Sequence, residues 1–123
     1  MMNDQTAKAD NSKLQLTLVP PELIEAVAVA RMYGNMKYHA PDNWKTVEKS
    51  RYRDALCRHL IAYLREPYGA DPESGIPHLF LLACNVAFLC AFEMTDGTLP
   101  SAQKALEQMH VPEQPQPRKG IYG

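Results

Sequence analysis

The sequence has little cysteine and no excess of charge of either sign. Its 123 residues contain 3 Cys, and 13 Lys and Arg stand against 14 Asp and Glu, for a formal net charge of −1. Three cysteines without a Cys-x-x-Cys pair are typical neither of a disulfide framework nor of a zinc site. We expect Cys57, Cys84 and Cys90, all in apolar helical patterns, to be buried. Balanced charge argues against binding to long nucleic acid.

The sequence also lacks a signal peptide and a long apolar run. Residues 1–13 have no apolar core. The longest apolar stretch, 79–92, is interrupted by Asn85 and is shorter than the roughly 20 residues of a membrane span. We therefore expect a cytoplasmic protein with no membrane partner, and we expect 79–92 to form a buried core helix. A glycine-rich phosphate loop, a GxSxG elbow and an HExxH motif are absent as well.

Helical patterns without a convincing strand predict an all-α fold. The first helix begins at Pro21, which suits the first helical position, and Gly34 after Tyr33 supplies a stop. The main patterns span, in order, about residues 21–33, 50–66 and 77–94. The last is apolar nearly all round, so it is expected at the centre. The prediction is a small bundle of three main helices with a short helix after Pro100.

The domain organisation follows from the composition of the two chain ends. Residues 1–12 are polar without periodicity, and residues 111–123 are rich in Pro and Gln. Such segments bury too little apolar surface to fold. We expect disordered tails at 1–12 and 111–123 and a single helical domain over 13–110.

Four polar residues fall on the interior faces of the second and third helices. His59 and Glu66 are seven residues apart on one helix, and His78 and Asn85 are seven apart on the next. Antiparallel packing across the short connection would make these pairs face each other. A buried charge or imidazole costs several kcal/mol unless it is paired. Two interpretations stay open: a site for a metal or polar ligand, and a hydrogen-bond network that fixes helix register.

Further candidates lie in the loops and on the flank of the second helix. Asp71 and Glu73 are suited to bind Mg²⁺ or Mn²⁺ together with Glu66. The alternative is that Asp71 forms a turn and that Glu73 lies in a solvated first helical turn. Tyr38 and Trp44 offer ring faces to a nucleobase, although a lone Trp also serves as a hydrophobic plug. The cations suited to phosphate are Lys13, Lys37, Arg51, Arg58 and Arg65. The alternative interpretation is that these charges only form a solvated face.

The order of short motifs resembles a known family. The motifs are D-N-S-K (10–13), L-x-L-V-P-P (16–21), G-x-x-K-Y (34–38), N-W (43–44), S-R-Y-x-x-A-L-x-R-H-L (50–60), D-P-E-S-G-x-P-H-L (71–79) and C-N (84–85). This succession, over about residues 9–93, resembles the N-terminal domain of phage and prophage dATP/dGTP diphosphohydrolases, the MazZ-type proteins.

The resemblance implies a phage- or prophage-encoded enzyme of the host cytoplasm. It would remove pyrophosphate from purine deoxynucleoside triphosphates with Mg²⁺ or Mn²⁺, and it would act as a homo-oligomer. The implied catalytic residues are His59, Glu73 and His78, and the implied metal ligands are Glu66, Asp71 and Glu73. The residues expected to bind the nucleotide are Lys13, Lys37, Tyr38, Asn43, Trp44, Arg58 and Asn85.

The chain departs from the family pattern at the metal carboxylates. Members carry Gly-Glu three residues before the Asp of DPESG, where this chain has Pro67 and Tyr68, with Glu66 displaced by two. A second His of the family is Leu81 here, and the EExxE helix of the wider all-α pyrophosphohydrolases is absent. The alternative function is therefore a non-catalytic nucleotide-binding protein, such as a phage sponge for a nucleotide immune signal. A third alternative is a helical adaptor.

Overall fold

The computed structural model describes residues 13–113 of the chain. The chain divides into two compact units. Residues 17–99 form the helical unit, and the second unit comprises residues 1–16 and 100–123, of which 13–16 and 100–113 are described. The tail expected at 1–12, and residues 114–123 of the tail expected at 111–123, lie outside the described residues.

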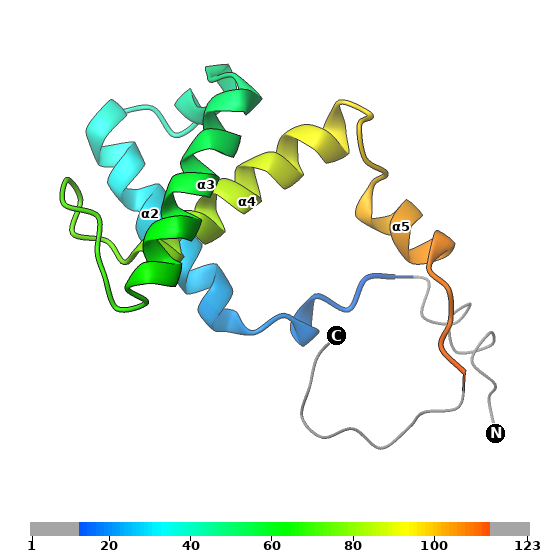
Figure 1. Ribbon diagram of the computed structural model, residues 1–123. Helices are drawn as coiled ribbons and strands as arrows, with labels where there is room; N and C mark the ends of the chain where they lie inside the picture. The colour runs from blue at the N-terminus through cyan, green and yellow to red at the C-terminus, as the bar shows by residue number, and fades with distance from the viewer. Residues whose placement is uncertain (1–12, 114–123) are drawn as a thin grey trace. The chain divides into compact units, whose positions relative to one another are not determined.

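All the regular structure of the described residues is helical, apart from an isolated β-bridge between Ala70 and Pro77. The predicted all-α bundle is therefore confirmed. The helical unit contains α2 (Pro21–Tyr38), the 3₁₀ helix η2 (Asn43–Thr46), α3 (Lys49–Arg65) and α4 (His78–Thr95) (Figure 1). The 3₁₀ helix η1 (Leu16–Leu18) spans the boundary between the units, and α5 (Ala102–Gln108) belongs to the second unit.

The sequence predicts that the first helix stops at Gly34, and this prediction is wrong. Helix α2 continues to Tyr38, and His39 ends it with a left-handed backbone (φ 57°) while its N–H donates to the carbonyl of Asn35. Glycine lowers helix stability by only about 1 kcal/mol, so one glycine does not end a helix that packs on a neighbour. The loop after the first helix is therefore shorter than a helix end at Tyr33 predicts, and Lys37 and Tyr38 lie on the last turn of α2.

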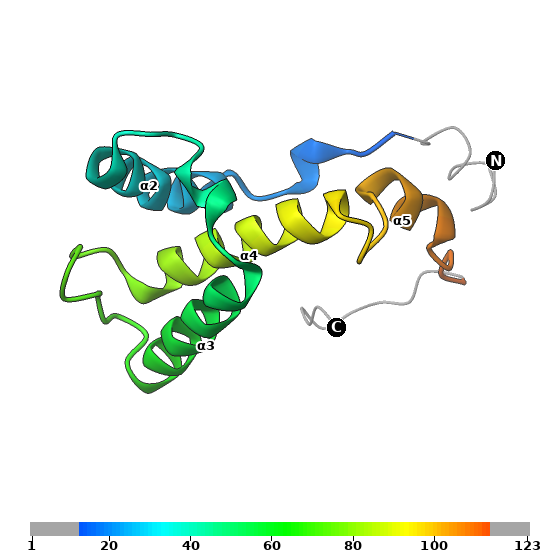
Figure 2. The same cartoon turned by 90° about the horizontal axis from the view of Figure 1, so that it is seen from above.

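Helix α4 lies between α2 and α3, as Figure 2 shows. The start of α3 is fastened to the end of α4 by three ion pairs. The ammonium of Lys49 lies 2.7 Å from Asp96 and 3.9 Å from Glu93, and the guanidinium of Arg53 lies 2.5 Å from Glu93. The two helices are therefore held antiparallel.

The core of the described residues is small, and the expectation of a buried third helix is wrong. Buried residues of α4 are Cys84 and Asn85 alone, and 11% of the helix is buried. Since α4 packs chiefly against α2 and α3, its remaining face is left exposed at Leu79 and Val86. Within the described residues, α4 alone is long and apolar enough to cross a membrane by length and composition, a test that core helices also meet.

The cysteines follow the same pattern. Cys84 is buried as expected, whereas Cys57 and Cys90 are exposed. The expectation that all three are buried is therefore wrong for two of them.

Candidate functional site

The helical unit contains a cavity of about 470 Å³ between α2, α4, the start of α3 and the loop that follows α2. This volume lies within the range of small-molecule sites, about 300–1,000 Å³. None of the described residues that line the cavity is acidic. The lining residues are Ala30, Arg31, Gly34, Tyr38, Ala40, Asn43, Trp44, Val47, Arg51, Tyr52, Leu81, Cys84, Asn85 and Phe88.

An aromatic wall closes one side of the cavity. The ring of Trp44 stacks on Phe88, with centroids 4.8 Å apart and planes 16° from parallel, and Tyr52 packs on Phe88 at 4.8 Å. The hydroxyl of Tyr52 donates to the carbonyl oxygen of Trp44 at 2.7 Å, which fixes η2 against α3. Trp44 therefore packs as a hydrophobic plug, which is one of its two interpretations from the sequence, and it also lines the cavity.

Arg31 supplies a cation that sequence reasoning missed. Its guanidinium carbon lies 5.9 Å from the centroid of Trp44 and 5.4 Å from that of Phe88, and one terminal nitrogen donates to the carbonyl oxygen of Pro41. The hydrogen bond and the two rings hold the guanidinium in place. Once α2 continues through Gly34, the spacing of Arg31, Gly34 and Tyr38 puts all three on one face, and this is the signal that would have identified Arg31.

Polar groups of α4 complete the cavity. Asn85 is 8% exposed, and its amide nitrogen donates to the carbonyl oxygen of Leu81 at 2.8 Å. Burial raises the pKa of the Cys84 thiol to about 11, although the positive charge of Arg31 opposes the shift. The thiol therefore stays protonated at neutral pH and is no nucleophile.

Of the four polar residues expected on interior faces, the two histidines meet, whereas Glu66 is exposed at the end of α3 and Asn85 bonds to Leu81. Nδ1 of His59 lies 3.0 Å from Nδ1 of His78, and the ring centroids are 5.2 Å apart. The two nitrogens point nearly at each other, so one donates the single proton that the other accepts. Burial lowers the pKa of His59, and the neighbouring His78 and Arg58 lower it further against the opposing charge of Asp71.

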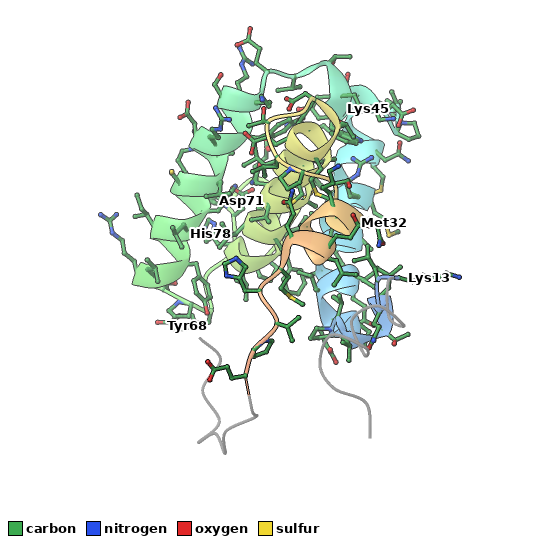
Figure 3. All side chains as sticks on the ribbon, turned by 90° about the vertical axis from the view of Figure 1, so that its right-hand side faces the viewer. Lys13, Met32, Lys45, Tyr68, Asp71 and His78 are labelled. Atoms are coloured by element: carbon green, nitrogen blue, oxygen red, sulfur yellow. The ribbon has the colours of Figure 1, made fainter. Side chains whose placement is uncertain are left out.

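Asp71 lies beside this histidine pair, and Figure 3 shows it next to His78. Its carboxylate accepts hydrogen bonds from the backbone N–H and the hydroxyl of Ser74, both at 2.9 Å. Burial alone would raise the pKa of Asp71, but the Ser74 hydrogen bonds and the two histidines lower it below its ordinary value. Asp71 is therefore ionised at neutral pH, beside the shared proton of the histidine pair.

The three carboxylates expected to bind a metal do not come together. Glu73 forms an ion pair with Lys37 at 3.1 Å, Asp71 is bound by Ser74, and Glu66 is exposed at the end of α3. Over residues 13–113, no group of three His, Cys, Asp or Glu side chains is placed to hold a metal ion.

The residues expected to bind a nucleotide are divided among several places. Tyr38, Asn43, Trp44 and Asn85 line the cavity, and Arg51, one of the cations suited to phosphate, lines it as well. Lys37 is engaged with Glu73, and Arg58 is exposed on α3 and does not line the cavity. Lys13 lies in the second unit.

Comparison with known protein families gives a match over most of the chain. A family model described as the N-terminal domain of dATP/dGTP diphosphohydrolase matches residues 3–101, which is most of the chain. No curated protein matches the chain, and no solved structure does.

Proposed function

Because the chain belongs to the family of the dATP/dGTP diphosphohydrolase N-terminal domain, we propose that its cavity binds a purine deoxynucleoside triphosphate. We further propose that the protein releases pyrophosphate from dGTP or dATP in the cytoplasm of a phage-infected host. The single observation that carries the proposal is the cavity itself, in which cations, amides and aromatic rings surround a space of about 470 Å³.

The charge of the lining supports an anionic ligand. Arg31 and Arg51 give the lining positive charge, and no described carboxylate lines the cavity to oppose it. Because Arg31 is held by Pro41 and two aromatic rings, Arg51 is the guanidinium that we assign to phosphate. A guanidinium presents a planar set of donors that matches phosphate oxygens. The cavity is therefore suited to a ligand that carries phosphate.

The rest of the lining supports a nucleobase. Tyr38 lines the cavity and is 56% exposed, so its ring is accessible to a base. Stacking of a base on an aromatic side chain contributes about 1–3 kcal/mol. The amides of Asn43 and Asn85 offer both donors and acceptors to the base edge. The cavity thus combines a surface for stacking with groups that distinguish one base from another.

We assign the histidine pair to the phosphate end of the nucleotide. Leu81 lines the cavity and lies three residues after His78 on α4, an axial rise of about 4.5 Å. A phosphate chain that leaves the cavity along α4 would thus reach the His59–His78 pair. An imidazole nitrogen of this pair would accept a proton from the attacking water, and Asp71 would stabilise the imidazolium that results.

The family implies a divalent metal, but the described residues of one chain do not form a suitable site. Mg²⁺ requires oxygen ligands in octahedral geometry, and Glu66, Asp71 and Glu73 do not converge. The proton transfer is therefore assigned to the histidine pair and Asp71, and Mg²⁺ or Mn²⁺ is supplied in the assay below.

A second candidate function is nucleotide binding without hydrolysis. The ion pair between Lys37 and Glu73 favours it, because it occupies a carboxylate that the family resemblance assigns to the metal. The ligand would then be a nucleotide held intact, including a cyclic nucleotide signal. This function and the first share the cavity and differ only in turnover.

The experiment measures binding and turnover on the same samples. Calorimetry with dGTP, dATP, their ribonucleotides and cyclic dinucleotides gives the affinities, and mass spectrometry with Mg²⁺ or Mn²⁺ detects conversion to the monophosphate. We expect micromolar binding of a purine nucleotide that Arg51→Gln weakens about tenfold, the loss of one charged hydrogen bond. Arg65→Gln is the matched control, since Arg65 lies exposed at the end of the same helix and outside the cavity.

The outcomes separate the two candidates. Release of pyrophosphate establishes the hydrolase, and tight binding without release establishes the second function. No heat of binding with any nucleotide would refute both.

A further inference from the structure

One glycine of the cavity has no structural reason to be glycine. Gly34 lies inside α2, four residues before the helix ends at Tyr38. Its backbone is not among those with positive φ, so its conformation is open to any L-residue. Glycine is the least favourable residue in a helix interior after proline, so α2 would be more stable with alanine at this position.

The other glycines of the described residues each have such a reason. Gly75 and Gly97 adopt positive φ values of 74° and 89°. A Cβ at Gly69 would come within 3.0 Å of the carbonyl oxygen of Glu66. A Cβ at Gly34 would meet only a terminal nitrogen of Arg31, at 3.9 Å, which is ordinary van der Waals contact. Neither conformation nor packing requires the absence of a side chain at Gly34.

The space beside Gly34 belongs to the cavity. Gly34 and Arg31 both line it, and the guanidinium is held by the carbonyl of Pro41 and by the rings of Trp44 and Phe88. A side chain at Gly34 would therefore stand next to a fixed guanidinium and take volume from the ligand rather than from the core.

We propose that Gly34 determines the size of the base that the cavity accepts, because its missing side chain leaves the space beside Arg31 that the second ring of a purine fills. This proposal rests on the proposed function, since it assumes a nucleotide in the cavity. A methyl group in that space disfavours a bicyclic base more than a monocyclic one. One methyl or methylene in a binding pocket changes affinity by about 10–200-fold.

The test replaces Gly34 with the strong helix formers alanine and leucine and measures stability and affinity together. We expect Gly34→Ala to raise the Tm by a few degrees, since it removes a helix-destabilising glycine. The same variant should weaken binding of purine deoxynucleoside triphosphates about tenfold or more and binding of pyrimidine ones about threefold or less. Gly34→Leu should abolish purine binding while the protein stays folded.

Asn35→Ala is the matched control. Asn35 is exposed on the next position of α2 and does not line the cavity. It should raise the Tm, because alanine favours a helix over asparagine, and it should leave every nucleotide affinity unchanged.

Each result bears on the proposal. A lower Tm for Gly34→Ala would mean that the glycine is structural, and equal purine affinity in Gly34→Ala and wild type would mean that the space is not used; either overturns the inference while the proposed function stands. A wild-type protein that binds no nucleotide refutes the proposed function and this inference with it.

Discussion

At the scale of single residues, the His59–His78 pair shows how burial and proximity set protonation. The two Nδ1 atoms are 3.0 Å apart and hold one proton between them. A second proton between these nitrogens would turn one ring into an imidazolium and set two N–H groups against each other, which the burial of His59 makes still less favourable. The folded state therefore resists a proton that the unfolded chain accepts.

We predict from this pair that stability falls on mild acidification. The pKa of His59 is lowered in the folded protein from an ordinary 6.5, so the unfolded state binds more protons once the pH drops below that value. Stability should be fully present above about pH 6.5 and should decline as the pH falls toward the folded-state pKa. Differential scanning fluorimetry from pH 8 to pH 5 should show the decline, and His59→Gln should flatten it.

His110→Gln serves as the control for this prediction, because His110 is exposed in the second unit. It should keep the wild-type pH profile. A profile of His59→Gln that parallels the wild type would assign the acid sensitivity to other groups.

At the scale of elements, the antiparallel pairing of α3 and α4 depends on charges at one end and imidazoles at the other. Glu93 is the centre of the charged end, since both Lys49 and Arg53 contact its carboxylate. The side chain of Glu93 is 17% exposed, so water screens its ion pairs less than it screens those of the more exposed carboxylates. Exposed ion pairs contribute about 0.2–1 kcal/mol each, and a shared, partly buried carboxylate is at the upper end.

Replacing Glu93 with glutamine should therefore lower the free energy of unfolding by about 1 kcal/mol. In a domain of this size that corresponds to a decrease in Tm of about 4–8 °C. Thermal unfolding at 50 mM and 500 mM NaCl should show a smaller difference at high salt, because salt screens the ion pairs. Glu25→Gln on the exposed face of α2 is the control. Equal effects of the two variants would show that the charged end contributes nothing specific.

At the scale of the whole molecule, the described residues bury little and leave large apolar side chains exposed. The buried hydrophobic residues among them are Ala26, Ala30, Ile76 and Cys84. One exposed stripe follows α3, where Leu60, Ile61 and Leu64 are 37%, 49% and 68% exposed at helical spacing. Exposed apolar patches of this kind mark interaction surfaces. They support the proposal, already implied by the family resemblance, that the protein is a homo-oligomer.

We predict that this stripe mediates self-association. Leu64→Asp should lower the apparent mass in sedimentation equilibrium, since a charge in an apolar interface must be desolvated. Arg65→Gln, at the adjacent position of α3, should leave the mass unchanged. A wild-type protein that sediments as a monomer at all concentrations would contradict the prediction.

Local pattern determined much of the fold. Hydrophobic periodicity predicted α3 and α4 within one residue at each end, and helical spacing predicted interior positions for His59 and His78. These features depend only on helical geometry and on the short loop between the helices, which the chain itself specifies. The same periodicity does not indicate how many other helices pack against a given helix. For this reason the sequence overestimates the burial of α4.

The sequence by itself determined the all-α class, the family and the interior positions of the two histidines, because each depends on residue types and spacings along the chain. Tertiary structure alone decided that α2 continues through Gly34 and that Arg31, Arg51, Tyr52 and Phe88 surround one cavity. It also decided that Lys37 holds Glu73, so that the acidic residues expected at one metal site are dispersed. These outcomes depend on which surfaces meet when three helices pack, and the free energy of packing is shared among residues too distant in the chain for any local pattern to express.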